Sequence, residues 1–100
     1  MDKAKIERLI VLAEECAEVQ QVISKIIRHG EFSSHPKSPD ITNRDLLESE
    51  IRDLFLAVHL LDQEGDIDVE RIGEVMEDKV SVDEYLKRKN KYLHFNIIKE

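Results

Sequence analysis

Apolar residues in the first third of the chain recur with the spacing of an α-helix. Between Lys3 and His29 most of them fall three or four positions apart. They spread around most of the helical circumference and comprise Ile6, Leu9, Ile10, Leu12, Ala13, Cys16, Ala17, Val19, Ile23, Ile26 and Ile27. Gly30 follows and accepts the left-handed backbone of a helix C-cap. The pattern predicts one long helix over Lys3–His29.

A second helical pattern covers residues 45–64 and has a clearer apolar side. That side gathers Leu46, Leu47, Ile51, Leu54, Phe55, Ala57, Val58, Leu60 and Leu61. The opposite side is a polar stripe of Glu48, Arg52, His59 and Gln63. Thr42 or Asn43 can cap the helix at its start, and Gly65 marks its end. The pattern predicts an amphipathic helix with one buried side.

The stretch between the two helices lacks any apolar period. Residues 31–43 include Ser33, Ser34, Pro36, Pro39 and Asp40, which are typical of irregular loops. We expect a surface loop that joins two antiparallel helices. A lid over a site is one use for such a loop.

Two shorter helices are predicted after the second one. Asp66 or Asp68 can cap a third helix that runs to about position 78. Ser81 and Glu84 form a capping-box pattern for a fourth helix, which extends to Tyr92 or beyond. The tail from position 95 is ambiguous, and no strand pattern of useful length occurs. The sequence predicts an all-α fold, an antiparallel bundle of about four helices.

The wide apolar circumference of the first helix bears on assembly. A chain of 100 residues is expected to form a single domain over positions 1–100. The shorter helices of one chain cannot cover such a circumference. We therefore expect the core to be completed by oligomerisation, in a homodimer or a dimer of dimers.

Composition and charge restrict the classes of partner and the cellular compartment that we expect for this chain. With 41% hydrophobic and 37% charged residues the chain is typical of a soluble helical protein, and its net charge of −7 disfavours nucleic acid as a partner. No signal-peptide or membrane-spanning pattern occurs, so we expect a cytoplasmic protein without a membrane partner. Cys16, the single cysteine, lies on an apolar side and is expected to be a buried core thiol.

Acidic residues interrupt the apolar sides of both long helices. They form two pairs with a spacing of three residues, Glu15 with Glu18 and Glu50 with Asp53. Glu50 lies near the centre of the apolar side of the second helix, Asp53 lies on the same side, and Glu15 lies among apolar residues of the first. A buried carboxylate is destabilising unless it gains a cation, a proton or a dedicated partner. The placement therefore indicates a bound metal ion.

The residue types of these pairs favour magnesium. Residues three apart project from nearly the same side of a helix, and two antiparallel helices bring such pairs to one point. Carboxylate oxygens without cysteine or paired histidine favour Mg²⁺, with Mn²⁺ as a substitute. Mg²⁺ held in this way keeps water positions that substrate phosphates can take, which indicates phosphoryl or nucleotidyl chemistry.

The acidic pairs belong to a longer motif. The sequence reads E-E-C-A-E from Glu14 to Glu18 and E-I-R-D from Glu50 to Asp53. In this it resembles the all-α nucleoside triphosphate pyrophosphohydrolases of the MazG-like group, whose signature is E-E-x-x-E followed one helix later by E-x-x-D. The resemblance extends through most of the chain up to about Asp68 and indicates the short, single-domain type.

That resemblance implies an activity and a set of roles. Members of the family cleave the α–β phosphoanhydride of (deoxy)nucleoside triphosphates and release monophosphate and pyrophosphate. The resemblance implies Mg²⁺ ligands at four positions, which are Glu15, Glu18, Glu50 and Asp53. Glu14 matches the first glutamate of the motif and is a candidate to bind a second metal ion or to orient the attacking water.

Basic residues are candidates for binding the phosphates of such a substrate. Lys25 lies two turns beyond Glu18 on nearly the same side of the helix, about 10 Å along the axis, and Arg28 follows one turn later. Lys79 and Lys87 are further candidates, because members of the family carry phosphate-contacting basic residues after the third helix. The four histidines show no ligand or nucleophile spacing and are expected to be structural or solvated.

Two other interpretations stay open. An all-α dUTPase shares the fold and similar acidic motifs and differs in the base that it recognises. This chain has no tryptophan to stack on a base, so its sequence does not define the base. A non-enzymatic helical module would use its acidic face only to hold a structural cation. A ferritin-like di-iron site is disfavoured, because no histidine stands at the offset of a Glu-x-x-His motif.

Overall fold

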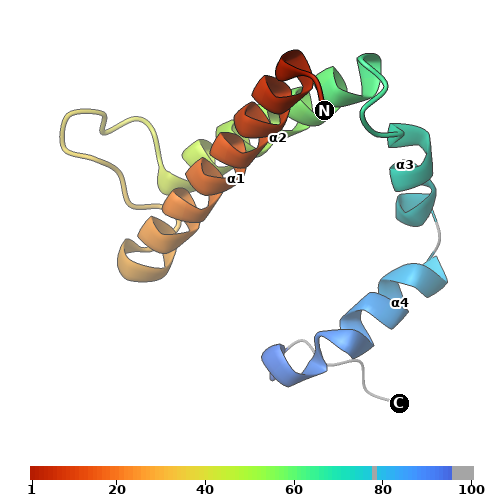
Figure 1. Cartoon of the computed structure of the whole chain (residues 1–100). Coiled ribbons are helices and arrows are strands. Elements are labelled where there is room, and N and C mark those ends of the chain that lie inside the picture. Colours follow the sequence, from red (N-terminus) through yellow and green to blue (C-terminus); the bar gives the residue numbers. More distant parts are fainter. Residues whose placement is uncertain (78, 96–100) are drawn as a thin grey trace. The chain divides into compact units, whose positions relative to one another are not determined.

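The chain folds into helices, the first two of which are joined by the loop of residues 30–42, as Figure 1 shows. The computed structural model describes the backbone of residues 1–77 and 79–95 and, outside positions 74–81, their side chains. The elements are α1 (Lys3–His29), α2 (Asn43–Gln63), α3 (Val69–Glu77), α4 (Lys79–Arg88) and a 3₁₀ turn η1 (Asn90–Tyr92). Extended pairing within the described residues is limited to one bridge between Ser34 and Thr42. The predicted all-α class is confirmed.

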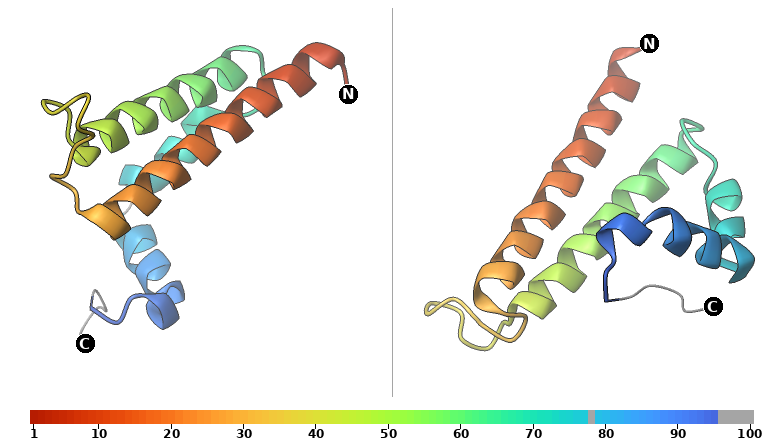
Figure 2. Two further views of the ribbon diagram at one scale, coloured as in Figure 1. Left: turned by 90° about the vertical axis from the view of Figure 1, so that its left-hand side faces the viewer. Right: turned by 90° about the horizontal axis from the view of Figure 1, so that it is seen from below.

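The helices belong to two compact units. The first, Met1–Ile67, contains α1 and α2, and the second, Asp68–Glu100, contains α3 and α4. Within the first unit α1 and α2 run side by side in opposite directions, which both views of Figure 2 show. All residues of the predicted carboxylate site lie in this helical hairpin. A single domain over the whole chain remains a prediction.

Both ends of α1 follow from local backbone chemistry. The side chain of Asp2 accepts a hydrogen bond from the backbone N–H of Lys5 at 2.8 Å, as an N-cap does. At the other end Gly30 adopts a φ of 93° and donates its N–H to the carbonyl of Ile26 at 2.7 Å. A side chain at Gly30 would be strained at this φ. The predicted bounds of α1 are confirmed.

The start of α2 is fixed by a capping box. The backbone N–H of Asp45 donates to Thr42 Oγ1 at 3.1 Å, and the N–H of Thr42 donates to Asp45 Oδ2 at 2.9 Å. These hydrogen bonds from Thr42 lower the pKa of Asp45. Of the two residues predicted as caps, Thr42 is the N-cap, and Asn43 is the first residue of the helix.

The second unit confirms one predicted helix start and corrects another. Asp68 Oδ1 accepts the N–H of Glu70 at 3.0 Å and caps α3, whereas Asp66 pairs with Arg8. α4 begins at Lys79, so the predicted start at Ser81 is wrong: an N-cap precedes the first helical residue, and this one lies inside the helix. α4 ends at Arg88, and the predicted continuation to position 92 is the 3₁₀ turn η1.

The least exposed residues of α1 form one narrow seam against α2. They recur at alternating intervals of three and four residues and comprise Lys5, Arg8, Leu12, Glu15, Val19, Val22 and Ile26. This is the spacing of the apolar stripe in a coiled coil. A matching row on α2 comprises Asn43, Leu46, Glu50, Asp53, Ala57 and Leu61. Leu61 is fully buried, and Val22 and Ala57 are 6% and 5% exposed. Acidic residues therefore occupy positions that a coiled coil fills with apolar ones.

Many of the large apolar side chains outside the seam are exposed. On α1 they include Ile6, Ile10, Ile23 and Ile27, and on α2 they include Phe55, Leu56 and Leu60. Cys16 is also exposed, so the predicted buried thiol is wrong: the residue lies beside the seam and not in it. The polar stripe of α2 is exposed as predicted. One partner helix covers only a narrow stripe of α1, and the rest of its wide apolar circumference stays open.

The two long helices, α1 and α2, both carry many charged residues. None of the described helices combines the length and the apolar character needed to cross a bilayer.

Candidate metal centre

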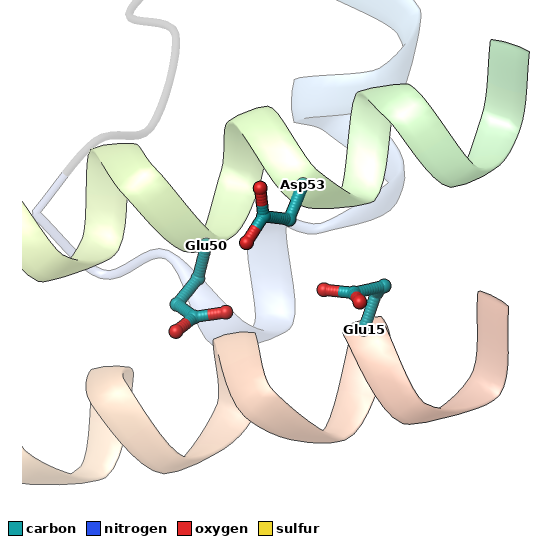
Figure 3. Close-up of side chains that lie close together, drawn as sticks. All are labelled: Glu15, Glu50 and Asp53. Atoms are coloured by element: carbon teal, nitrogen blue, oxygen red, sulfur yellow. The ribbon is translucent and has the colours of Figure 1, made fainter. Parts of the chain in front are cut away.

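Three carboxylates from α1 and α2 converge at the middle of the seam. Glu15 comes from α1, and Glu50 and Asp53 come from α2, as Figure 3 shows. One carboxylate oxygen of each lies within 4.8 Å of those of the other two. The spacing of three residues places Glu50 and Asp53 on one face of α2, and the antiparallel packing brings Glu15 opposite them. The structure thus brings together three of the four predicted ligands.

The fourth predicted ligand lies at the edge of this cluster. Glu18 is exposed, and it is not within the group of three. Glu18 nonetheless acts on Glu50: side-chain hydrogen bonding with Glu18 is the first cause of a raised pKa at Glu50, and desolvation is the second. Glu14 is exposed as well, and its charge acts on the neighbouring Glu15. The solvent-exposed side of the cluster therefore carries two further carboxylates.

Two carboxylate oxygens of the cluster are buried without compensation. Oε2 of Glu15 and Oε2 of Glu50 are inaccessible to solvent and have no hydrogen-bond partner. Desolvation is the first cause of a raised pKa at Glu15, and the charges of Glu18 and Asp53 add to it. Such oxygens are rare in folded proteins unless they bind a proton, a cation or water. The donor set and its orphaned oxygens fit a divalent cation.

No ion pair to a described lysine, arginine or histidine neutralises the cluster. Among the residues that the structure describes, the ion pairs are Arg8–Asp66 and Arg44–Glu48, and neither involves the cluster. Apolar seam residues lie one turn from the cluster on either side: Leu12 and Val19 on α1, and Leu46 and Ala57 on α2. The negative charge of these half-buried carboxylates thus lies between two apolar layers.

The open end of the hairpin is closed by a separate ion pair. Arg8 Nε donates to Asp66 Oδ2 at 2.6 Å, and its Nη2 donates to Oδ1 at 3.1 Å. The side chain of Asp66 is only 5% exposed, and the hydrogen bond from Arg8 lowers its pKa. Two parallel hydrogen bonds of this kind fix orientation as well as distance. Sequence reasoning missed this pair, because 58 residues separate its members.

The predicted phosphate-binding residues fall into two groups. Lys25 and Arg28 lie on the last turns of α1 and line a pocket beside the loop of residues 30–42. Lys87 is exposed near the end of α4, in the second unit. Lys79 begins α4, and its side chain lies outside the described ones. Only Lys25 and Arg28 are therefore placed in the same unit as the carboxylates.

The pocket also contains residues that sequence reasoning did not assign to a site. His29, the last residue of α1, and His35 in the loop were expected to be structural or solvated, and both line the pocket together with three loop serines. The only signal for the loop residues in the sequence was a run of polar residues without a period, which is shared by most loops. Their grouping depends on how the loop returns to α2.

Comparisons with known proteins gave no match for this chain among protein families, curated proteins or solved structures.

Proposed function

We propose that this protein is a Mg²⁺-dependent nucleoside triphosphate pyrophosphohydrolase, which cleaves the α–β phosphoanhydride and releases monophosphate and pyrophosphate. The observation that supports this most is the cluster of Glu15, Glu50 and Asp53 with its two buried, unpartnered oxygens. All three residues belong to the E-E-x-x-E and E-x-x-D motifs, which supports the same site.

The ligand set favours Mg²⁺, and Mn²⁺ as its substitute. All three side chains of the cluster offer carboxylate oxygens, and the group includes neither histidine nor cysteine. Three protein ligands also leave coordination positions for substrate and water in an octahedral ion. A closed structural site would enclose its cation with more protein oxygens.

Each carboxylate has a distinct part in this proposal. Glu15, Glu50 and Asp53 would hold the ion, which when bound polarises a phosphoryl oxygen and lowers the pKa of a coordinated water. Glu18 would steady Glu50 from the exposed edge. Glu14, next to Glu15 and open to solvent, would orient the attacking water or hold a second ion.

A nucleotide panel tests the activity directly. We expect pyrophosphate release from at least one ribo- or deoxyribonucleoside triphosphate with Mg²⁺ or Mn²⁺, and none after chelation with EDTA. Release from dUTP alone would instead favour the dUTPase interpretation. No release from any nucleotide, with intact Mg²⁺ binding, would support a structural cation and contradict the proposal.

The exposed apolar residues lead to a prediction about assembly. We expect a homodimer or a dimer of dimers at micromolar concentration, because Ile10, Ile27 and Phe55 are 52%, 79% and 66% exposed in one chain. Multi-angle light scattering measures the mass, and Phe55→Lys should shift it toward the monomer. Arg52→Lys, on the polar stripe, is the matched control. A monodisperse monomer with full helicity would contradict this prediction.

A further inference from the structure

A pocket of about 560 Å³ lies where the end of α1, the loop of residues 30–42 and the start of α2 meet. Figure 1 shows this loop at the closed end of the hairpin. None of the residues that line the pocket is acidic, although the chain contains 22 acidic residues. The lining consists instead of basic, imidazole, hydroxyl, amide and a few apolar side chains. This composition is suited to an anion.

Two cations of α1 stand on one wall of this pocket. Lys25 and Arg28 are three residues apart and thus project from the same side of the helix. Neither has an ion-pair partner in the described part of the chain. Arg28 Nε donates to the carbonyl of Ser24 at 3.3 Å, which leaves its two terminal nitrogens for a ligand. An ammonium and a guanidinium side by side are the usual protein ligands of phosphate.

The loop adds neutral hydrogen-bond donors. His35 Nδ1 accepts the backbone N–H of Lys37 at 3.0 Å, so a neutral imidazole carries its proton on Nε2 and donates from there. Ser34 and Ser38 contribute hydroxyl groups to the lining. The backbone hydrogen bond from Ser38 N to the carbonyl of His35, at 2.9 Å, holds this part of the loop in a turn.

The N-terminus of α2 does not itself supply the anion site. Its first N–H groups are already used: Asn43 N donates to Ser33 O and Arg44 N to Glu31 O, both at 2.8 Å. The next N–H, of Asp45, is satisfied by the capping box. The buried side chain of Asn43 also donates to the carbonyl of Gly30 at 3.1 Å. These bonds fix the loop, and binding of an anion depends on the side chains of the pocket.

The pocket and the carboxylate cluster lie next to each other along the hairpin. Leu46 lines the pocket, and Glu50 follows one turn later on α2. Lys25 lies two turns from Glu18 on α1, or about 10 Å along the axis. A ligand that reaches both places must be elongated, with one anionic part bound through a cation and another bound directly by basic side chains. A triphosphate chain has this form.

We propose that the pocket binds the β- and γ-phosphoryl groups of the nucleotide and then the pyrophosphate that leaves; this assignment rests on the proposed function. In that reaction the oxygen of water bonds to the α-phosphorus, and the bond from the α-phosphorus to the bridging oxygen breaks. The bridging oxygen keeps the electron pair and departs on the β-phosphate, and the proton of the water passes to a carboxylate of the site. Lys25 and Arg28 lie where they stabilise the charge that builds on the leaving group.

The binding test uses the whole protein and inorganic pyrophosphate in EDTA, measured by titration calorimetry. Lys25→Gln and Arg28→Gln should each weaken the affinity about tenfold, the usual effect of losing one charge-assisted hydrogen bond. Arg52→Gln is the matched control: it removes the same charge from the exposed stripe of α2 and should leave the affinity nearly unchanged. Circular dichroism confirms that each variant folds. Equal affinities for all three variants would overturn the proposal.

A kinetic test identifies which phosphate the pocket binds. With Mg²⁺ and the best nucleotide, pyrophosphate should inhibit competitively, raising KM without changing kcat, and Lys25→Gln should abolish this competition. Noncompetitive inhibition would assign the pocket to a separate phosphate ligand and contradict the assignment to the substrate. If no nucleotide is hydrolysed, the proposed function fails, and the calorimetric titration still decides whether the pocket binds pyrophosphate.

Discussion

Glu50→Gln is expected to abolish hydrolysis and yet leave the metal-free protein at least as stable as the wild type. Activity should fall by about a hundredfold or more, because the neutral amide is a poor ligand for the divalent cation that the reaction needs. In EDTA the same change removes a charge that is desolvated and repelled by Glu15, Glu18 and Asp53. We therefore expect the melting temperature without metal to stay unchanged or to rise by a few degrees.

A matched control lies two residues away on the same helix. Glu48 is exposed, and it pairs with Arg44 at 3.3 Å across one turn of α2. A surface pair of this kind contributes little to stability, so Glu48→Gln should change neither activity nor melting temperature appreciably. Wild-type hydrolysis by Glu50→Gln, or damage by Glu48→Gln, would show that the carboxylate cluster is not the site.

Adding Mg²⁺ at neutral pH should raise the free energy of unfolding and the melting temperature of this protein substantially. An ion that binds only the folded state adds about 3 kcal/mol at a concentration a hundredfold above its Kd, which raises the melting temperature by roughly 10 °C in a small domain. Differential scanning calorimetry with Mg²⁺ and with EDTA measures the difference. Glu15→Gln should remove most of it, because one of the three clustered carboxylates is lost. A melting temperature that does not change when Mg²⁺ is added would contradict the proposed metal centre.

The effect of Mg²⁺ should grow with pH. The folded-state pKa values of Glu15 and Glu50 are raised above the ordinary value of 4.5, so over that range the folded state binds more protons than the unfolded state. The stability that this provides without metal is present below pH 4.5 and is lost as the pH rises through the raised pKa values. Mg²⁺ competes with these protons and therefore binds more tightly as the pH increases.

The opposite pH dependence is expected from two other carboxylates. The pKa values of Asp45 and Asp66 lie below the ordinary 3.8, and their contribution to stability is lost as the pH falls through the lowered values. Melting temperatures in EDTA should therefore be highest in mildly acidic buffer. Glu50→Gln should reduce the fall in melting temperature on the alkaline side. A fall as steep as in the wild type would show that Glu50 does not cause it.

The helices and the carboxylate positions were largely predictable from the sequence, because both depend on periodicity. The bounds of α1 follow from the apolar repeat and from Gly30, and the capping residues of α2 stand at its start. The same period places Glu15, Glu50 and Asp53 toward the partner helix. Periodicity, however, defines only a direction on a helix. It does not tell how wide a stripe the partner covers, which is why Cys16 and Glu18 lie in the open.

Features that depend on the path of the chain were beyond sequence reasoning. The pocket forms because hydrogen bonds from Asn43 and Arg44 hold residues 30–33 of the loop against the start of α2, and no repeat in the sequence encodes these contacts. Arg8 and Asp66 are 58 residues apart in the sequence and meet only because the antiparallel hairpin brings its two open ends together. α4 starts at Lys79, so the capping pattern at Ser81 lies inside the helix and does not define its start.

The narrow seam with acids at its centre has a consequence for how the two helices find their alignment. A seam built only of leucine, valine and alanine would permit the helices to slide by a turn at little cost, since one apolar layer fits another. Polar groups at such positions select a single alignment. With Glu15 facing Glu50 and Asp53, any slide would set a charge against the apolar layers of Leu12 or Ala57. A cation bound at this point would therefore fix the alignment of the two helices. Apolar substitutions of the seam acids would strengthen the packing of the helix pair but would no longer select one alignment.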